Sequence, residues 1–226
     1  VVTRLNASVE CRSARVSSNE NGVVVSMRVA VVGAGPSGLY ATDALTSAGH
    51  QVDVIERLPV PFGLVRYGVA PDHFSIRSVR NTLEKILNDP SVRLLAGVEV
   101  GVDVSVQELL AAYDAVILTY GASRDRSLDI PGEDLDGSIA ATDLVAWYCG
   151  HPDADRERIE AAIRAASSVV VVGVGNVAVD VTRILIAPAD RLAQTDMPQH
   201  VLDVLAESSI TDVHVLGRRS PAHATW

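Results

Sequence analysis

One arrangement of residues occurs twice along the chain and restricts its fold more than any other feature. Residues 28–32 (RVAVV) form a short β-branched run that leads into GAGPSG at 33–38. Residues 168–172 (SVVVV) form a second run that leads into GVGNVA at 173–178. Each run has the pattern of a buried strand that turns directly into a helix. The sequence therefore predicts an α/β fold with two Rossmann-like units, in which parallel strands alternate with helices.

The first glycine turn has the spacing that holds the pyrophosphate of a dinucleotide at a helix N-terminus. Gly33 permits the tight turn, Gly35 lets the backbone approach the phosphates, and Gly38 lets the helix pack against the strand. Glu56 lies 21 residues after Gly35, at the end of the next expected strand, 51–56. A carboxylate there can accept hydrogen bonds from ribose hydroxyls, and it repels a 2′-phosphate. The first turn is therefore expected to prefer FAD or NAD to NADP.

The second turn carries Ala178 at its third position, a common variant of the pattern. A strand is expected at 211–216, and Arg218 and Arg219 follow it where an acid would otherwise stand. Guanidinium groups bind phosphate through paired hydrogen bonds, which favours NADPH over NADH. The alternative is a solvated pair at a strand end, because the separation from Gly175 exceeds the usual spacing of about 20 residues. Two such turns in one chain indicate a flavoenzyme that passes a hydride from NADPH to FAD.

The segments between the turns carry local signals of their own. Helical spacing of apolar residues predicts helices at 39–48 and 76–87. Ser105 and Glu108 have the spacing of a capping box that opens a short helix. The apolar run at 115–119 is typical of a buried strand. These elements extend the alternation of strands and helices between the two turns.

Composition excludes several classes of protein. The net charge of −9 and the pI near 5.1 argue against a nucleic-acid-binding protein. Cys11 and Cys149 stand far apart and in no CxxC pattern, which argues against a disulfide scaffold, a metal site and a thioredoxin-type dithiol. No apolar run approaches the length of a membrane span. Two separate thiols are typical of a reducing compartment, and a bacterial cytoplasm is expected.

The positions of the two turns divide the chain into three parts. Residues 1–26 have little hydrophobic periodicity and predict a disordered extension, or a start upstream of Met27. Residues 27–121 are expected to form the N-terminal part of an FAD-binding domain. Residues 122–226 are expected to form an NADP-binding domain. The chain is expected to end before either domain is complete.

A more specific pattern comes from five segments. They are PVPFGLVRYGVAPDH at 59–73, VEVGVD at 98–103, YDAVILTYGA at 113–122, IPGED at 130–134 and GNVAVD at 175–180. With these segments the chain resembles the adrenodoxin reductase family, which includes bacterial ferredoxin–NADP reductases. The resemblance extends over residues 27–219 almost continuously.

The resemblance implies a set of residues for each nucleotide. FAD would be bound through Gly33, Gly35, Ser37, Gly38, Glu56, Leu64 and Val100. NADPH would be bound through Gly175, Asn176, Val177, Ala178, Arg218 and Arg219. His73 would lie near the flavin and take part in proton or hydride handling, and its alternative role is to anchor its loop by a hydrogen bond. No metal site is implied.

The activity that the resemblance implies is that of a ferredoxin–NADP reductase. NADPH would reduce the flavin by hydride transfer, and the flavin would release electrons singly to a ferredoxin-type iron–sulfur protein. Members of the family continue beyond the end of this sequence, so the alternative is a truncated, inactive remnant that at most binds nucleotide. Exposed strand edges, poor solubility and weakened flavin retention are then expected. The missing cysteine clusters disfavour the electron-input subunit of a glutamate synthase, and the missing CxxC disfavours a thioredoxin reductase.

Overall fold

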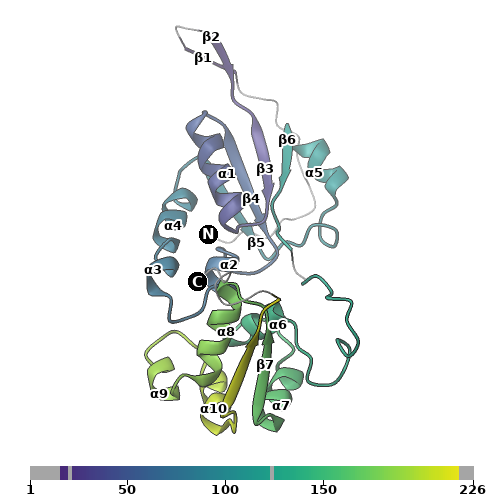
Figure 1. Cartoon of the computed structure of the whole chain (residues 1–226). Helices are drawn as coiled ribbons and strands as arrows, with labels where there is room; N and C mark the ends of the chain where they lie inside the picture. Colours follow the sequence, from purple (N-terminus) through teal and green to yellow (C-terminus); the bar gives the residue numbers. More distant parts are fainter. Residues whose placement is uncertain (1–15, 20–21, 123–124, 219–226) are drawn as a thin grey trace. The chain divides into compact units, whose positions relative to one another are not determined.

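The computed structural model describes most of the chain (Figure 1). The described ranges are residues 16–19, 22–122 and 125–218. Arg219, which was predicted to bind a 2′-phosphate, lies outside them.

The described chain packs into two compact units. The first unit holds the residues up to Arg66 together with Ser78–Gly121. The second unit holds Tyr67–Arg77 together with the residues from Ala122 onward. Each unit contains one of the two glycine turns. The assignment of the two parts of the chain as FAD- and NADP-binding domains stays a prediction.

A four-stranded parallel sheet forms the centre of the first unit, in the order β5-β4-β3-β6. Its strands are β3 (Arg28–Val32), β4 (Gln51–Glu56), β5 (Val92–Ala96) and β6 (Ala115–Leu118). The sheet therefore reverses its direction of growth between β3 and β6, as doubly wound sheets do where they bind nucleotides. The predicted strands at 28–32 and 51–56 are confirmed, and β6 ends one residue before the predicted boundary.

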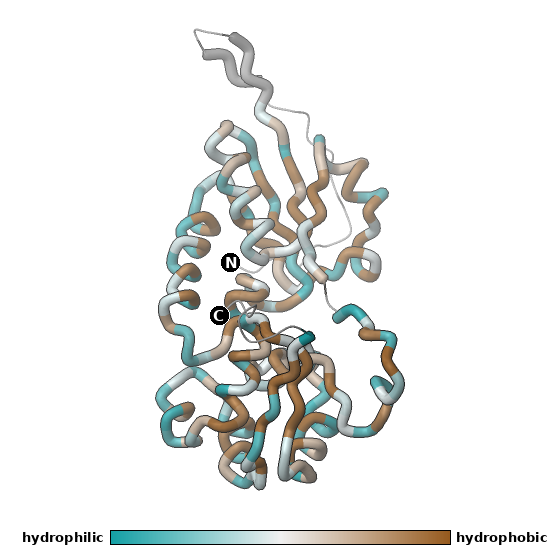
Figure 2. The backbone as a smooth tube through the Cα atoms, viewed as in Figure 1, coloured by the Kyte–Doolittle hydropathy of each residue, from teal (hydrophilic) through white to brown (hydrophobic). Residues whose placement is uncertain are grey.

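Helices cover both faces of this sheet, because successive side chains of a strand point to opposite faces. Val29 and Val31 of β3 belong to an apolar cluster that includes residues of α1 (Pro36–Ser47) and α4 (Arg80–Leu87). Ala30 and Val32 belong to a second cluster, which includes Leu109 of α5 (Val106–Ala112). The four strands are accordingly mostly hydrophobic along their length, as the brown segments of Figure 2 show, and this is usual for parallel sheets.

Two of the predicted helices differ from the structure in their bounds. Helix α1 begins at Pro36, three residues earlier than expected, because proline suits the first turn of a helix. The predicted helix at 76–87 is wrong as a single element, since α3 (Phe74–Arg77) and α4 are separate. Arg77 forms an ion pair with Asp196 in the second unit, whereas α4 packs in the first. The apolar spacing is continuous there, but packing divides the segment.

The capping box predicted from Ser105 and Glu108 is present at the start of α5. The Ser105 hydroxyl accepts a hydrogen bond from the Glu108 amide at 3.2 Å, and the Glu108 carboxylate accepts one from the Ser105 amide at 2.8 Å. Hydrogen bonds from the Ser105 amide and hydroxyl also lower the pKa of Glu108. The motif fixes the start of this seven-residue helix.

A buried carboxylate, Asp53, ties several segments of the first unit together. It accepts hydrogen bonds from the guanidinium groups of Arg28 (2.6 Å) and Arg93 (2.9 and 2.7 Å), and from the Tyr113 hydroxyl (2.7 Å). Burial acts to raise the pKa of Asp53, but the hydrogen bonds from Arg93, Tyr113 and Arg28 outweigh it and lower the pKa. Burial, with the neighbouring Asp53 charge, raises the pKa of Tyr113 to about 12. The network links β3, β4 and β5 to the segment that follows α5.

An antiparallel hairpin precedes β3, formed by β1 (Val16–Asn19) and β2 (Gly22–Val25). The predicted extension at 1–26 contained no such element. β-Branched valines occur in both strands, a composition that favours extended structure.

The second unit is built around two parallel strands, β7 (Ser168–Val172) and β8 (Asp212–Leu216). Among the described residues after 125, this unit contains five helices. They pack on one side of the two strands. They are α6 (Ala141–Tyr148), α7 (Arg156–Ala165), α8 (Asn176–Ile186), α9 (Ala189–Leu192) and α10 (Gln199–Glu207). The core contains the fully buried side chains of Trp147 and Tyr148.

The two faces of the β7–β8 pair differ in exposure. Val169, Val171 and Val213 pack against the core of the unit. On the other face, Val170, Val172 and Leu216 are 56%, 59% and 53% exposed. The sequence predicted exposed strand edges, and the described residues also show an exposed face of this strand pair.

Candidate dinucleotide-binding turns

The first turn lies where β3, β4 and β6 end. The Gly33 amide donates a hydrogen bond to the Ile55 carbonyl of β4 at 2.7 Å, and the Thr119 amide donates one to the Val32 carbonyl at 2.8 Å. Gly33 has φ +108°, a conformation that favours glycine. The backbone of the turn is thus held from both sides at the carboxyl ends of the strands, the usual place for a nucleotide in such sheets.

The glycines of this turn are required for different reasons. A Cβ on Gly33 would lie 2.6 Å from the Thr119 carbonyl oxygen, and a Cβ on Gly38 would lie 2.0 Å from the Gly33 carbonyl oxygen. Gly35 has φ −81°, and the nearest atom to a Cβ there is the Gly63 Cα at 3.9 Å. The folded chain therefore demands glycine at 33 and 38, but it makes no such demand at 35.

Glu56 ends β4 and reaches back to the turn. One carboxylate oxygen accepts a hydrogen bond from the Ala34 amide at 2.8 Å, and the other accepts one from the Leu58 amide at 2.9 Å. The predicted ribose contact of Glu56 stays a prediction. Each carboxylate oxygen has a second acceptor position, so the observed bonds are compatible with it.

Thr119 is a residue of this turn that the sequence reasoning did not identify. Its hydroxyl lies 2.9 Å from the Val32 carbonyl oxygen and 3.2 Å from that of Gly33, to which it donates. A threonine at the end of the fourth strand, beside the point where strand order reverses, is a signal that could have indicated this position.

The remaining residues predicted to bind FAD occur in the same unit. Ser37 is exposed in the first turn of α1, and Leu64 is 69% exposed at the start of α2 (Leu64–Tyr67). The chain just before Leu64 contacts the turn, because the Phe62 amide donates to the Ala34 carbonyl at 2.8 Å. Val100 is half-buried and packs against the cluster on the α5 face of the sheet.

The second turn has the same kind of backbone as the first, but a Cβ at its first glycine would have more space. Gly173 has φ +133°, and its amide donates to the Leu216 carbonyl of β8 at 2.8 Å. A Cβ on Gly173 would lie 4.0 Å from the Ala178 methyl, which explains why alanine fits at the third position here. Gly175 has φ −94°, and a Cβ there would meet no protein atom within 4 Å among the described residues. Gly175 therefore matches Gly35.

The other residues predicted for the second nucleotide flank this turn where they are described. Asn176 and Val177 are exposed in the first turn of α8, and Arg218 is exposed just after β8. Arg218 follows Gly175 by 43 residues because α9 and α10 are inserted between α8 and β8. The insertion accounts for the spacing that left the role of Arg218 open.

His73 is placed in the second unit, opposite α8. Its Nε2 lies 3.6 Å from Asp180 Oδ1. The adjacent Asp72 accepts two hydrogen bonds from the Arg183 guanidinium, at 2.7 and 2.8 Å. The hydrogen bond from Arg183 lowers the pKa of Asp72, and the same bond raises the pKa of Arg183. The loop before α3 is thus anchored chiefly by Asp72, whereas His73 faces a carboxylate.

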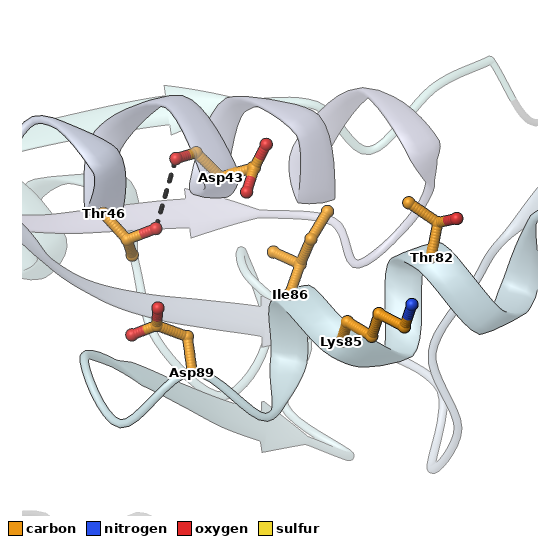
Figure 3. A pocket seen from close by; sticks show the side chains of 6 residues that line it. All are labelled: Asp43, Thr46, Thr82, Lys85, Ile86 and Asp89. Carbon is orange, nitrogen blue, oxygen red and sulfur yellow. Dashed lines mark hydrogen bonds between the residues drawn. The ribbon is translucent and has the colours of Figure 1, made fainter.

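A pocket of about 260 Å³ lies elsewhere in the first unit, between α1 and α4 (Figure 3). It is lined by Asp43, Thr46, Thr82, Lys85, Ile86 and Asp89. The Thr46 hydroxyl donates to the Asp43 carbonyl at 3.2 Å, so part of its polar lining is satisfied within α1. None of the residues predicted to bind a nucleotide lines this pocket.

Two features are absent from the described part of the chain. No group of three or more His, Cys, Asp or Glu side chains in it is arranged to hold a metal ion. Nor does that part contain a helix with the length and apolar character needed to cross a membrane.

Comparison with known proteins gives consistent matches. The family described as pyridine nucleotide-disulphide oxidoreductase matches residues 27–219. The mitochondrial NADPH:adrenodoxin oxidoreductase of Drosophila melanogaster is 45% identical over 201 residues, which cover 88% of this chain and 42% of that protein. The NADPH-ferredoxin reductase FprA of Mycobacterium leprae is 47% identical over 205 residues, with coverage of 88% and 44%.

A solved structure agrees with these relatives. The structure of Mycobacterium tuberculosis FprA in complex with NADPH matches with a TM-score of 0.83 and 45% identity, covering 88% of this chain and 45% of that one. The present chain thus spans less than half the length of these relatives. The resemblance to adrenodoxin reductases and the two-unit α/β fold are both confirmed.

Proposed function

Because the chain belongs to the pyridine nucleotide-disulphide oxidoreductase family, we propose that it takes part in electron transfer from NADPH, through FAD, to a ferredoxin-type iron–sulfur protein. The named activities of the relatives support this proposal, since they are NADPH:adrenodoxin and NADPH-ferredoxin reductases. The proposed location in a bacterial cytoplasm rests on the mycobacterial relatives and on the pair of separate thiols.

One observation carries the proposal furthest: glycine stands at 35 and at 175 without a reason inside the folded chain. Both residues have negative φ and are N-caps of helices, where a Cβ would meet no atom of the described residues closer than 3.9 Å. A group that approaches the backbone from outside the chain supplies the missing reason. Pyrophosphate is such a group, because it must come close to the amides of a helix N-terminus.

The first turn fits FAD. Among the described residues no side chain caps α1, so the backbone amides that follow Pro36 remain available as donors to phosphate oxygens. We assign the phosphates to the backbone at Gly33, Gly35, Ser37 and Gly38, and the ribose to Glu56. Leu64 and Val100 would supply apolar contacts. A carboxylate at Glu56 disfavours a 2′-phosphate, so this turn would hold the flavin nucleotide and not NADPH.

The second turn fits NADPH. Helix α8 also has no capping side chain among the described residues, and its start is formed by Gly175, Asn176, Val177 and Ala178. Arg218 would contact the 2′-phosphate, with Arg219 proposed as its neighbour. The bound flavin supplies the chemistry that accepts a hydride and gives up electrons one at a time. His73 would handle a proton or anchor its loop.

Reconstitution tests the proposal. The purified chain is mixed with FAD, freed of unbound FAD, and assayed for a visible flavin band and for NADPH-dependent ferricyanide reduction. The expected result is a flavin band together with turnover that prefers NADPH to NADH. Bound nucleotide without turnover would instead identify the chain as a nucleotide-binding remnant. Failure to bind either nucleotide would refute the proposal.

A matched pair of variants makes the test specific. Gly35→Ala is expected to weaken FAD binding and leave NADP⁺ binding in place, and Gly175→Ala is expected to do the reverse. The two glycines have nearly the same backbone conformation and the same helix position, so each variant is the control for the other.

A further inference from the structure

One peptide of the first turn, the one that joins Gly33 to Ala34, is held at both of its ends. The Gly33 carbonyl oxygen accepts a hydrogen bond from the Thr119 hydroxyl at 3.2 Å. The Ala34 amide donates to Glu56 Oε2 at 2.8 Å. Because the carbonyl and the amide hydrogen of a trans peptide point in opposite directions, Thr119 and Glu56 hold this peptide from opposite sides.

The same peptide lies in a closely packed place. Ala34 is fully buried. A Cβ on Gly38, in the buried first turn of α1, would overlap the Gly33 carbonyl oxygen and come within 2.7 Å of Thr119 Oγ1. The carbonyl oxygen of Gly33 is therefore directed at the packed side of the helix, where the Thr119 hydroxyl meets it.

The backbone of Thr119 brings its side chain to this point. The Thr119 amide donates to the Val32 carbonyl at 2.8 Å, and the hydroxyl lies 2.9 Å from the same oxygen. A hydroxyl has one proton, which is shared here between the carbonyl oxygens of Val32 and Gly33. A β-branched side chain has few rotamers, so the backbone bond also fixes the direction of the hydroxyl.

The orientation of the Gly33–Ala34 peptide matters for an anion. Rotation of the peptide would bring the Gly33 carbonyl oxygen to the side of the Glu56 carboxylate and would turn the Ala34 amide away from it. Backbone N–H groups of a turn attract phosphate, whereas a carbonyl oxygen repels it. The observed orientation is therefore the one that suits a pyrophosphate.

We propose that Thr119 is a positioning residue for the nucleotide of the first turn. Its hydroxyl keeps the Gly33 carbonyl on the buried side, and thereby keeps the turn in the conformation that binds the phosphates of FAD. The proposal rests on the proposed function, because the binding of FAD at this turn comes from there. Thr119 acts through the Gly33–Ala34 peptide and not by contact with the nucleotide.

The alternative is that the Thr119 hydroxyl only stabilises the fold. Its loss would then lower the free energy of unfolding, and the folded protein would bind FAD as before. Affinity and stability therefore have to be measured side by side.

Three variants make this comparison. Thr119→Val removes the hydroxyl and keeps the shape of the side chain, and it is expected to weaken FAD binding roughly 3- to 10-fold, the effect of about one hydrogen bond. Thr119→Ser keeps the hydroxyl and should restore most of the affinity. Thr42→Val is the matched control, because the Thr42 hydroxyl is also buried in the first unit and donates to a backbone carbonyl, that of Gly38, at 2.8 Å. It should lower stability without a change in FAD affinity.

A second measurement needs no nucleotide. Hydrogen exchange of the Ala34 amide reports directly on the peptide that Thr119 is proposed to hold, and it should be faster in T119V than in the unchanged protein. The Gly33 amide, which donates to the Ile55 carbonyl at 2.7 Å, serves as the reference and should keep its rate. Urea unfolding gives the stability of each variant.

An unaltered FAD affinity in T119V would overturn the proposal, and so would an equal loss in T42V or a loss in T119S as large as that in T119V. If T119V does not fold, Thr119→Ala carries the same expectations. An unchanged protein that binds no FAD refutes the proposed function. The exchange rate of the Ala34 amide then decides separately whether Thr119 holds the peptide: faster exchange in T119V supports it, and an unaltered rate contradicts it.

Discussion

Gly35 and Gly38 are three residues apart, yet their replacement by alanine should affect different properties: Gly38→Ala the stability of the fold, and Gly35→Ala the binding of FAD. A Cβ at Gly38 would lie 2.0 Å from the Gly33 carbonyl oxygen and 2.7 Å from the Thr119 hydroxyl. The first of these is backbone and cannot move aside. Overpacking of this kind costs about 1–3 kcal/mol, so Gly38→Ala should lower the free energy of unfolding by at least that amount.

Gly35→Ala should leave the stability of the nucleotide-free protein nearly unchanged. Its φ of −81° and ψ of 179° are open to alanine, and a Cβ would have 3.9 Å of clearance. Alanine is a poorer N-cap than glycine by about 0.5–1 kcal/mol, whereas it lowers the entropy of the unfolded chain by a similar ~0.4–1 kcal/mol. The two terms cancel to within about 0.5 kcal/mol.

Gly35→Ala should instead lower the affinity for FAD. A methyl group placed where the backbone must approach the pyrophosphate costs about 1–3 kcal/mol, which corresponds to a loss of roughly 5- to 150-fold in affinity. Urea unfolding followed by circular dichroism measures the first quantity, and titration of FAD by quenching of its fluorescence measures the second. The reasoning fails if G35A binds FAD as the unchanged protein does, or if it unfolds as easily as G38A.

Three further outcomes follow from contacts described above. Asp53→Asn should lower the free energy of unfolding by about 1.5–3 kcal/mol, because hydrogen bonds to a charged group are lost. Because the pKa of Asp53 is lowered in the folded state, Asp53 contributes to the free energy of unfolding above the ordinary pKa of a carboxyl group, and this contribution disappears as the pH falls through the folded-state pKa. In urea unfolding between pH 3 and 7, the free energy of unfolding of D53N should therefore decrease less toward low pH. Ser105→Ala should cost about 1 kcal/mol, seen as a lower urea midpoint with an unchanged slope. Arg218→Ala should weaken binding of NADP⁺ but not of NAD⁺ in a calorimetric titration, and equal losses for both would contradict the assigned 2′-phosphate contact.

Local pattern was sufficient to locate both glycine turns and the strands that lead into them. The residues that make a strand-to-helix turn are contiguous, so their spacing is visible in the sequence. The same holds for the capping box at Ser105, whose partners are three residues apart. Such features need no knowledge of packing.

Features that depend on distant pairing were not accessible in this way. Thr119 holds the first turn across 87 residues, and Arg183 holds Asp72 across 111. The helix expected at 76–87 is divided because its two parts pack in different units, which apolar spacing does not reveal. The separation between Gly175 and Arg218 was open to two interpretations because spacing alone does not reveal the two helices inserted between α8 and β8.

Glycine is required at the four turn positions for different reasons, and this difference has an evolutionary consequence. Folding requires glycine at 33 and 38 in any lineage that keeps this architecture, whereas at 35 and 175 only the proposed binding of nucleotide would require it. In a descendant released from nucleotide binding, drift should replace the latter pair first and leave the former untouched. Substitution rates at these four sites, compared among close orthologues, would therefore date the loss of binding separately from the loss of structure.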